Sequence, residues 1–178
     1  YYWGFLKKGL SLSQNIDSIV FEKDAPLRDE FKYLYASVFK KPENYVKIIE
    51  ALGTKKVGMT REEIITATKI PNSGDLTTKL EELESCGFIR KYNAFGMKKK
   101  NAIYQLMDCF TLFYFKFLKS EPTDEHFWTN QINTPAANTW LGLAFERVCM
   151  EHVDQIKFKL GISGVLTEVN SWYCKSDP

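Results

Sequence analysis

The sequence lacks the motifs on which several large enzyme classes depend. It contains no G-x-x-x-x-G-K-[ST] loop, so we do not expect this chain to bind ATP through such a loop. It has no G-x-S-x-G nucleophile elbow, and its cysteines and histidines form no catalytic pair with an orienting partner. Glu168-Val169-Asn170 falls short of a nuclease-type E-x-K motif, because asparagine cannot supply the cationic amine. We therefore assign no catalytic residue and no cofactor site from these motifs.

Cysteine, histidine and long apolar runs are also scarce. The four cysteines lie far apart without a C-x-x-C pair, and the two histidines are isolated, so neither a metal site nor a disulfide scaffold is predicted. This spacing favours reduced thiols in a cytoplasmic protein. The longest apolar stretch, residues 110–118, is far shorter than the roughly 20 residues that a membrane span needs. No signal-peptide pattern opens the chain, and we expect no membrane partner.

A strong excess of charge of either sign is missing as well. The formal net charge is +2 and the pI is about 8.3, so any role in binding nucleic acid must be local. With 44% hydrophobic and 26% charged residues, the composition is that of an ordinary globular protein. A length of 178 residues allows one large core or two small ones. Because the chain begins at Tyr1-Tyr2-Trp3 without a methionine, we interpret it as a piece of a longer protein.

A pattern of three helices and two strands is present in residues 44–107. Apolar residues recur at helical spacing in three segments, and Thr60 and Glu63 form a capping box that opens the second. Residues 88–92 and 102–106 are typical of two strands joined by a basic hairpin tip. This order predicts a winged helix-turn-helix. The apolar positions of its helices are Tyr45, Ile48, Ile49 and Leu52, then Ile64 and Ile65, then Leu76, Leu80 and Leu83.

Helices are predicted on both sides of this pattern, which makes the fold mainly α-helical with a small β component (α+β). In the helical segment at residues 1–41, residues 24–26 open a helix whose Pro26 suits a first helical position. Its predicted buried residues are Leu27, Phe31, Leu34 and Val38. Residues 108–119 predict an aromatic helix, apolar on nearly every side, which favours burial within the chain over an interface. The rest is expected to hold a linker at 120–138, a helix at 136–160 with Leu141, Ala144, Phe145, Val148 and His152 along one side, and a strand at 164–173.

The predicted winged helix offers the best candidate binding surface. In the DNA-binding version of the fold, the start of the third helix enters the major groove and the hairpin contacts the backbone. The candidate groove residues are Ser73, Asp75, Thr77, Thr78 and Lys79, and the candidate phosphate contacts are Lys98, Lys99 and Lys100 at the hairpin tip, with Arg90 and Lys91 added to the same face. The same helix continues with Glu81, Glu82 and Glu84, which repel a DNA backbone. A protein-docking or purely structural winged helix is therefore the alternative to duplex DNA.

Several segments in order resemble predicted AAA-type ATPases of the STAND-like kind from archaea and bacteria. The similar segments are Arg28-Asp29-Glu30-Phe31, Leu34-Tyr35, Glu81-Glu82-Leu83, Gly87-Phe88-Ile89-Arg90, residues 104–108, residues 113–117, Phe127-Trp128, residues 140–146 and residues 161–165. In that family a P-loop domain precedes a helical lid, a winged helix and a C-terminal domain that resembles PD-(D/E)xK nucleases. The resemblance covers nearly the whole chain.

The resemblance implies a role for each of three segments. Residues 1–41 would be the end of the ATPase lid, residues 44–107 the winged helix, and residues 108–178 an aromatic helix, a linker and the start of a nuclease-like α/β domain. ATP and Mg²⁺ would bind in an N-terminal ATPase domain, a partner that this chain lacks. Glu146 matches the first-helix glutamate of the nuclease-like domain, whose Asp and E-x-K ligands for a divalent cation would lie beyond Pro178.

Three functions therefore compete. The leading hypothesis is a non-catalytic regulatory and DNA-binding part of an AAA-type ATPase. The second is a protein-interaction module, including a homo-oligomer, that uses the aromatic helix at residues 110–117 and the acidic end of the third helix as contact surfaces. The third is part of a metal-dependent nuclease in which Glu146 acts.

Overall fold

The computed structural model describes residues 2–93 and 102–167. About 59% of the chain is helical and about 6% is strand, which confirms a mainly α fold with a small β component. The chain divides into two compact units. The first consists of Tyr1–Lys40 and Cys109–Ile156, and the second of Lys41–Asp108 and Lys157–Pro178. Two segments far apart in the sequence therefore build each unit.

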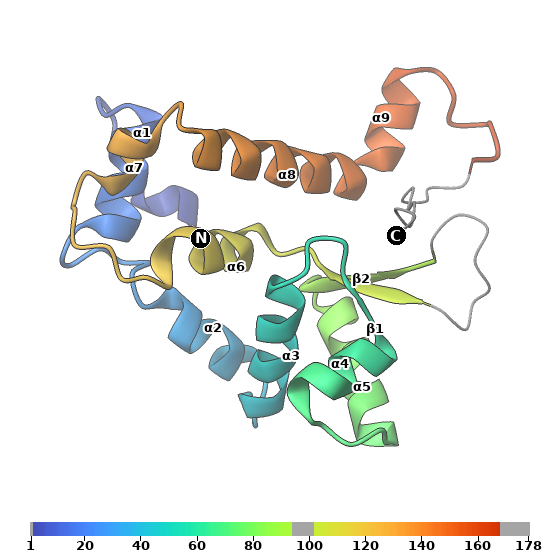
Figure 1. The fold of residues 1–178 in the computed structure, drawn as a ribbon. Helices are drawn as coiled ribbons and strands as arrows, with labels where there is room; N and C mark the ends of the chain where they lie inside the picture. The colour runs from blue at the N-terminus through green and yellow to red at the C-terminus, as the bar shows by residue number, and fades with distance from the viewer. Residues whose placement is uncertain (1, 94–101, 168–178) are drawn as a thin grey trace. The chain divides into compact units, whose positions relative to one another are not determined.

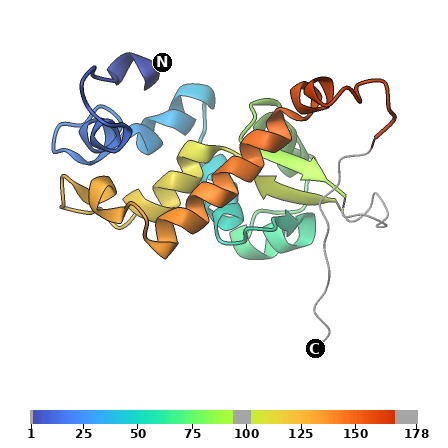
Figure 2. The same cartoon turned by 90° about the horizontal axis from the view of Figure 1, so that it is seen from above.

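In the described residues of Lys41–Asp108, the second unit consists of helices and a small antiparallel sheet (Figure 1). Its elements are α3 (Glu43–Gly53), β1 (Met59–Thr60), α4 (Arg61–Thr68), α5 (Gly74–Ser85), β2 (Ile89–Tyr92) and β3 (Ile103–Leu106). β3 lies between β1 and β2 and pairs antiparallel with both. The β2–β3 pair is the two-arrow ribbon in Figure 2. This order of helices and strands is that of a winged helix-turn-helix, as the sequence predicts.

The helical periodicity of the sequence accounts for the core of this unit. On α3 the residues at positions i, i+3, i+4 and i+7 all point inward, and Leu76, Leu80 and Leu83 do so on α5. Ile64 is fully buried on α4, whereas Ile65 is only half-buried, so one of the two predicted inward residues lies at the edge. Burial of these side chains at about 1.5–3 kcal/mol each is the main force that holds the helices together.

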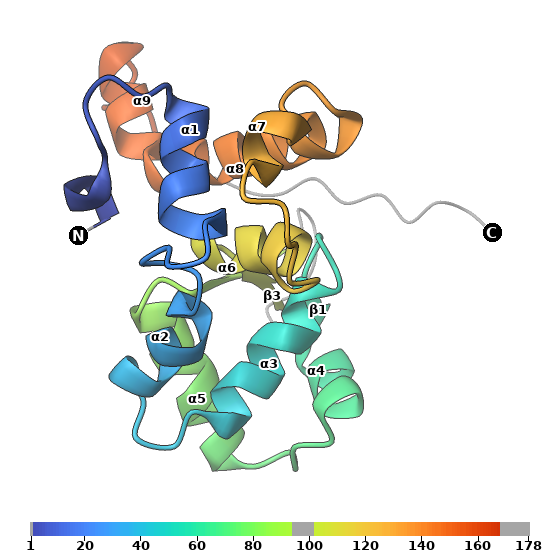
Figure 3. The ribbon, with the colours of Figure 1, turned by 90° about the vertical axis from the view of Figure 1, so that its left-hand side faces the viewer.

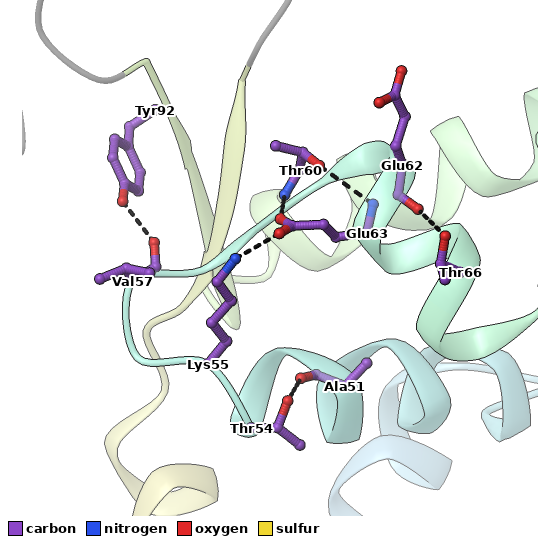
Figure 4. Close-up of polar contacts among 9 residues, drawn as sticks. All are labelled: Ala51, Thr54, Lys55, Val57, Thr60, Glu62, Glu63, Thr66 and Tyr92. Atoms are coloured by element: carbon purple, nitrogen blue, oxygen red, sulfur yellow. Dashed lines mark hydrogen bonds and ion pairs between the residues drawn. The ribbon is translucent and has the colours of Figure 1, made fainter. Parts of the chain in front are cut away.

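A capping box fixes the start of α4, as predicted (Figure 4). The Thr60 hydroxyl accepts a hydrogen bond from the Glu63 N–H at 3.3 Å, and the Glu63 carboxylate accepts one from the Thr60 N–H at 2.7 Å. Lys55 Nζ lies 2.6 Å from the same carboxylate. The hydrogen bonds from Lys55 and from the Thr60 N–H lower the pKa of Glu63. One carboxylate thus joins the α3–β1 loop to the helix start.

The same loop passes so close to the sheet that only glycine fits at one position. Gly58 has φ +85°, and a Cβ there would lie 2.4 Å from the carbonyl oxygen of Tyr104. The neighbouring carbonyl of Val57 accepts a 2.7 Å hydrogen bond from the Tyr92 hydroxyl, which is also drawn in Figure 4. Gly58 therefore allows the chain to enter β1 beside β3.

The first unit is helical in the residues that the structure describes. Its elements are the short 3-10 helix η1 (Tyr2–Phe5), α1 (Leu12–Ile16) and its π-helical continuation η2 (Asp17–Phe21), α2 (Glu30–Val38), α6 (Cys109–Phe113) and its π-helical continuation η4 (Tyr114–Leu118), α7 (Phe127–Gln131) and α8 (Pro135–Glu151). A further helix, α9 (Val153–Lys159), spans the boundary between the units.

An aromatic cluster forms the core of the first unit. The ring centroids of Phe113 and Phe117 lie 5.2 Å and 5.1 Å from that of Trp128, and Trp140 packs 6.0 Å from Trp128 in an edge-on orientation. The aromatic helix predicted at residues 108–119 is thus present as α6 and η4. Its buried residues pack within this chain, as predicted.

A buried carboxylate ties the N-terminal part of this unit to α7. Asp17 is 2% exposed. It accepts hydrogen bonds from the backbone N–H groups of Trp128 at 2.7 Å and Thr129 at 3.1 Å, and from the Thr129 hydroxyl. These N–H groups belong to the first turn of α7, where an anion is favoured. Figure 3 shows α1 and α7 side by side, in agreement with their contacts.

Some predicted boundaries in this unit are wrong. α2 begins at Glu30 rather than near Pro26, because residues 26–29 form turns. Its buried residues are Phe31 and Tyr35, whereas Val38 is exposed. Leu34 is half-buried, whereas Tyr35, one turn after Phe31, is in the core. The Tyr35 hydroxyl has a buried partner there, the hydroxyl of Thr111 at 2.8 Å.

The C-terminal predictions also need correction. The expected linker at residues 120–138 contains helix α7, because Asp17 caps its N-terminus and Trp128 is buried. The single helix expected at residues 136–160 is interrupted at His152, which ends α8. Of the strand expected at residues 164–173, residues 164–167 are turn or irregular, and the remainder lies outside the described residues. The described part of residues 108–178 therefore contains helices and no strand.

Candidate nucleic-acid interface

The first turn of α5 displays hydroxyl side chains to solvent. Ser73 is the N-cap residue in extended conformation, and Leu76, Leu80 and Leu83 occupy the inward side of the helix. With about 100° of rotation per residue, Thr78 lies opposite that side and Thr77 beside it. Ser73, Thr77 and Thr78 are all exposed. Three of the predicted contact residues are therefore together at one accessible helix start.

Arg61 holds the turn that leads into this helix start. Its Nε donates to Asn72 Oδ1 at 3.0 Å and its Nη2 donates to the Ser73 carbonyl at 2.9 Å. Arg61 is the first residue of α4, so it connects the two helices of the helix-turn-helix. Sequence reasoning missed this residue. Its position directly after the capping residue Thr60 could have indicated that its side chain lies at the start of α4, near the α4–α5 turn.

Lys69 is a second basic residue that the sequence analysis missed. It ends α4 in the left-handed conformation, with φ 57°, and it is exposed in the α4–α5 turn. A non-glycine residue rarely adopts this conformation, so the periodicity of the sequence gave no sign of it. It lies in the segment between the two helices, four residues before Ser73.

Lys79 does not extend the exposed surface as the sequence suggested. Its side chain is only 13% exposed and forms an ion pair with Asp75 one turn earlier. Its Nζ also lies 5.4 Å from the centroid of the Tyr45 ring on α3. The lysine therefore turns toward the flank of α5, where its charge is shared with Asp75 and the aromatic ring.

Two carboxylates of α5, Glu82 and Glu84, accept hydrogen bonds from other elements of this unit. The Tyr45 hydroxyl donates a hydrogen bond to Glu82, and burial together with this bond raises the pKa of Tyr45 to about 12. Glu84 accepts a 3.1 Å hydrogen bond from the backbone N–H of Lys91. Glu82 and Glu84 thus lie along opposite flanks of the helix. Glu81 is exposed on the turn that follows Thr77 and Thr78.

Arg90 and Lys91 point to opposite faces of the sheet, because successive strand residues alternate. Arg90 Nε donates to Gln105 Oε1 at 2.7 Å, and its guanidinium lies 4.5 Å from the Tyr92 ring centroid. The Nζ of Lys91 is 5.8 Å from the centroid of Tyr104. The expectation that both side chains extend one face is therefore wrong. Lys98, Lys99 and Lys100 lie outside the described residues.

Glu146 lies exposed on α8 in the first unit. The adjacent Arg147 is 3% exposed and donates to the Leu143 carbonyl at 3.1 Å. Burial lowers the pKa of Arg147, an effect that the negative charge of Glu146 opposes. Among residues 2–93 and 102–167, no group of three or more His, Cys, Asp or Glu side chains has the arrangement of a metal site. Glu146 is therefore not accompanied by other metal ligands in that part of the chain.

Comparisons with known proteins add no identification. No family model, curated protein or solved structure matches the chain. The resemblance to AAA-type ATPases therefore stays a prediction from the sequence. None of the helices in the described part of the chain has the length and apolar character needed to cross a bilayer.

Proposed function

We propose that residues 41–108 bind duplex DNA through the first turn of α5. The observation that carries this proposal is the exposed turn of Ser73, Thr77 and Thr78, held in place by the two hydrogen bonds of Arg61. In winged helices this turn is the part that enters the major groove. Hydroxyl groups at a helix start suit both phosphate oxygens and base edges.

Basic residues around this turn supply the electrostatic part of binding. Lys69 lies in the α4–α5 turn and Lys91 lies on β2, and the sequence between β2 and β3 contains Lys98, Lys99 and Lys100. Each lysine that neutralises a phosphate adds close to one unit to the dependence of log K on log salt. Because Glu82 and Glu84 are held at the flanks of α5, Glu81 is the glutamate of this helix that shares the face of Thr77 and Thr78. The module therefore favours low or moderate affinity that depends strongly on salt.

A fluorescence-anisotropy titration with a labelled duplex of random sequence, at several salt concentrations, tests the proposal. The double substitution Thr77→Ala with Thr78→Ala should weaken binding about 5- to 150-fold, because two exposed hydroxyl contacts worth about 0.5–1.5 kcal/mol each are removed. Thr139→Ala is the matched control, since Thr139 is also exposed and donates to the carbonyl four residues earlier, but lies on α8. No binding by the unmodified chain at 20 mM salt would contradict the proposal.

The sequence resemblance supports a wider setting for this module. In that setting it is the non-catalytic, regulatory and DNA-binding part of an AAA-type ATPase, and ATP and Mg²⁺ bind to an ATPase domain that this chain lacks. DNA binding by the winged helix would then regulate the activity of that ATPase domain. Addition of MgATP to this chain alone should leave its affinity for DNA unchanged, and a measurable effect would contradict this division of roles.

A protein-docking winged helix is the second candidate function. It is favoured by the acidic character of α5, which carries Asp75, Glu81, Glu82 and Glu84 against the single cation of Lys79. The substitution Glu81→Gln separates the two candidates. Removal of this charge should strengthen binding to DNA about 2- to 10-fold if α5 faces the phosphates. If both the unmodified chain and Glu81→Gln show negligible affinity for DNA, the protein-docking function is favoured.

A further inference from the structure

An open apolar groove of about 450 Å³ lies in the first unit. It is formed by residues of α1, α6, α7 and α8 and the turn between α7 and α8, and no charged side chain lines it. The most apolar parts of its wall are Leu12, Ile16, Phe110, Trp128, Trp140 and Leu141. Leu12 at the rim is 68% exposed. This surface is separate from the candidate nucleic-acid interface, which lies in the other unit.

An exposed apolar ridge continues from the groove along α8. Leu141, Phe145 and Val148 follow at positions i, i+4 and i+7, so they share one face of the helix. They are 49%, 70% and 45% exposed, whereas Arg147 on another side of α8 is buried. Ala137, one turn before Leu141 on the same face, is buried in the groove. An aromatic side chain has about 150–250 Å² of surface, so most of the Phe145 ring is in contact with water. A contiguous apolar surface of this kind marks an interaction site.

We propose that two copies of this chain pack through this surface about a twofold axis, with antiparallel α8 helices. In this arrangement Phe145 of each copy enters the groove beside Leu141 of the other. Phe145 and Leu141 are four residues apart, a rise of about 6 Å along the helix. A twofold contact requires a hollow and a matching protrusion on the same surface, because each copy presents the same patch to the other. The groove and the Phe145 ridge meet this requirement.

The absence of charge in this surface favours a second copy as the occupant. Residues near a twofold axis face themselves, so a charged side chain there would meet its own like charge. Neither the groove wall nor the three ridge residues carry a charge. A small apolar ligand would fill the groove but leave Phe145 and Val148 exposed, whereas a second copy covers the groove and the ridge together.

The size of the contact sets the expected strength. α8 has 17 residues and is about 25 Å long, so the contact is limited to one helix and the groove beside it. We therefore expect a reversible dimer with a dissociation constant in the micromolar range. This dimer does not depend on the DNA-binding proposal, since it uses the other unit.

Sedimentation equilibrium between about 1 and 200 µM tests the dimer. The substitution Phe145→Asp should weaken dimerisation at least tenfold, because it places a carboxylate in the groove of the partner and opposes like charges near the axis. Phe158→Asp is the matched control, since Phe158 is 71% exposed, very close to Phe145, but lies on α9 in the other unit. This control should dimerise like the unmodified chain. Circular dichroism should show the same helical content in all three proteins.

Tryptophan fluorescence gives a second readout of the same contact. Trp140 lines the groove and is half-buried, so its emission should shift to shorter wavelength as concentration rises in the unmodified chain and in Phe158→Asp, but not in Phe145→Asp. A chain that stays monomeric at 200 µM would overturn the proposal. Equal weakening by both substitutions would also overturn it. So would a monomer that cosediments with neutral phosphatidylcholine vesicles, because the ridge would then be a membrane-facing surface.

Discussion

At the scale of single residues, Tyr45 shows how the core of the winged helix reaches its candidate interface. Its ring belongs to the inward face of α3, and its hydroxyl bonds to Glu82 on α5. The same ring lies next to the ammonium group of Lys79. One buried aromatic residue therefore orients both a carboxylate and a cation of the candidate recognition helix.

The raised pKa of Tyr45 predicts a loss of stability in alkali. The pKa is about 12 in the folded protein against about 10 in an unfolded chain, so the stabilising effect is complete below pH 10 and is lost as the pH rises to 12. The loss should be on the order of 1–2 kcal/mol. Urea unfolding at pH 8, 10 and 12 measures it, and Tyr45→Phe should reduce the decline.

The control for this experiment is Tyr33→Phe, because Tyr33 is 67% exposed on α2. This variant should retain the full decline between pH 10 and 12. An identical decline in Tyr45→Phe would show that Tyr45 does not cause the effect.

At the scale of elements, the sequence predicted helices with a continuous apolar stripe better than short helices. α3 and α5 have such stripes, and their buried residues follow from spacing alone. α7 is five residues long and begins in a polar segment, so its periodicity is too short to detect. It is stabilised by Asp17, whose position in the sequence gives no sign of this contact. The candidate site follows the same division. The exposure of Thr77 and Thr78 follows from helical spacing on α5. The partial burial of the Lys79 side chain depends on Tyr45, which belongs to another helix.

The dependence of α7 on a distant carboxylate gives an element-scale prediction. Asp17→Ala should destabilise the first unit by about 2–4 kcal/mol, because two backbone N–H groups and the Thr129 hydroxyl lose a charged acceptor, one of them fully buried. Thermal unfolding followed by circular dichroism measures the change. Asp124→Ala is the control, since Asp124 accepts two hydrogen bonds beside the same helix but is exposed, and it should lower the stability far less than Asp17→Ala.

At the scale of the whole molecule, the sequence did not indicate which segments share a core. Residues 1–41, 44–107 and 108–178 were expected as three successive segments. Contacts join Tyr1–Lys40 with Cys109–Ile156, and the winged helix is inserted between them. This grouping depends on contacts such as Asp17 to Trp128, which are 111 residues apart and leave no local pattern. Periodicity describes single elements, so it cannot show which distant elements pack together.

The insertion of residues 41–108 between the two segments of the first unit predicts that fragments of the two units differ in their ability to fold alone. A fragment of residues 41–108 should unfold cooperatively, because the buried residues of α3, α4 and α5 pack with one another and with the sheet. A fragment of residues 109–156 should remain unfolded, because Asp17, Phe21 and Val20 complete its core. Thermal melts of the two fragments measure the difference. Cooperative melting of the second fragment alone would contradict this prediction.

The hydrogen bonds of Asp17 also impose an order on biosynthesis. A ribosome that has completed residue 40 must add 89 further residues before Thr129 is available to that carboxylate. At roughly 5–20 residues per second, this interval lasts about 5–20 s. All of residues 41–108 are synthesised in the meantime, and within that segment α3 packs on α4 and on β3, and α5 on β2. The winged helix can therefore fold on the nascent chain while the helices of residues 2–40 still await α7.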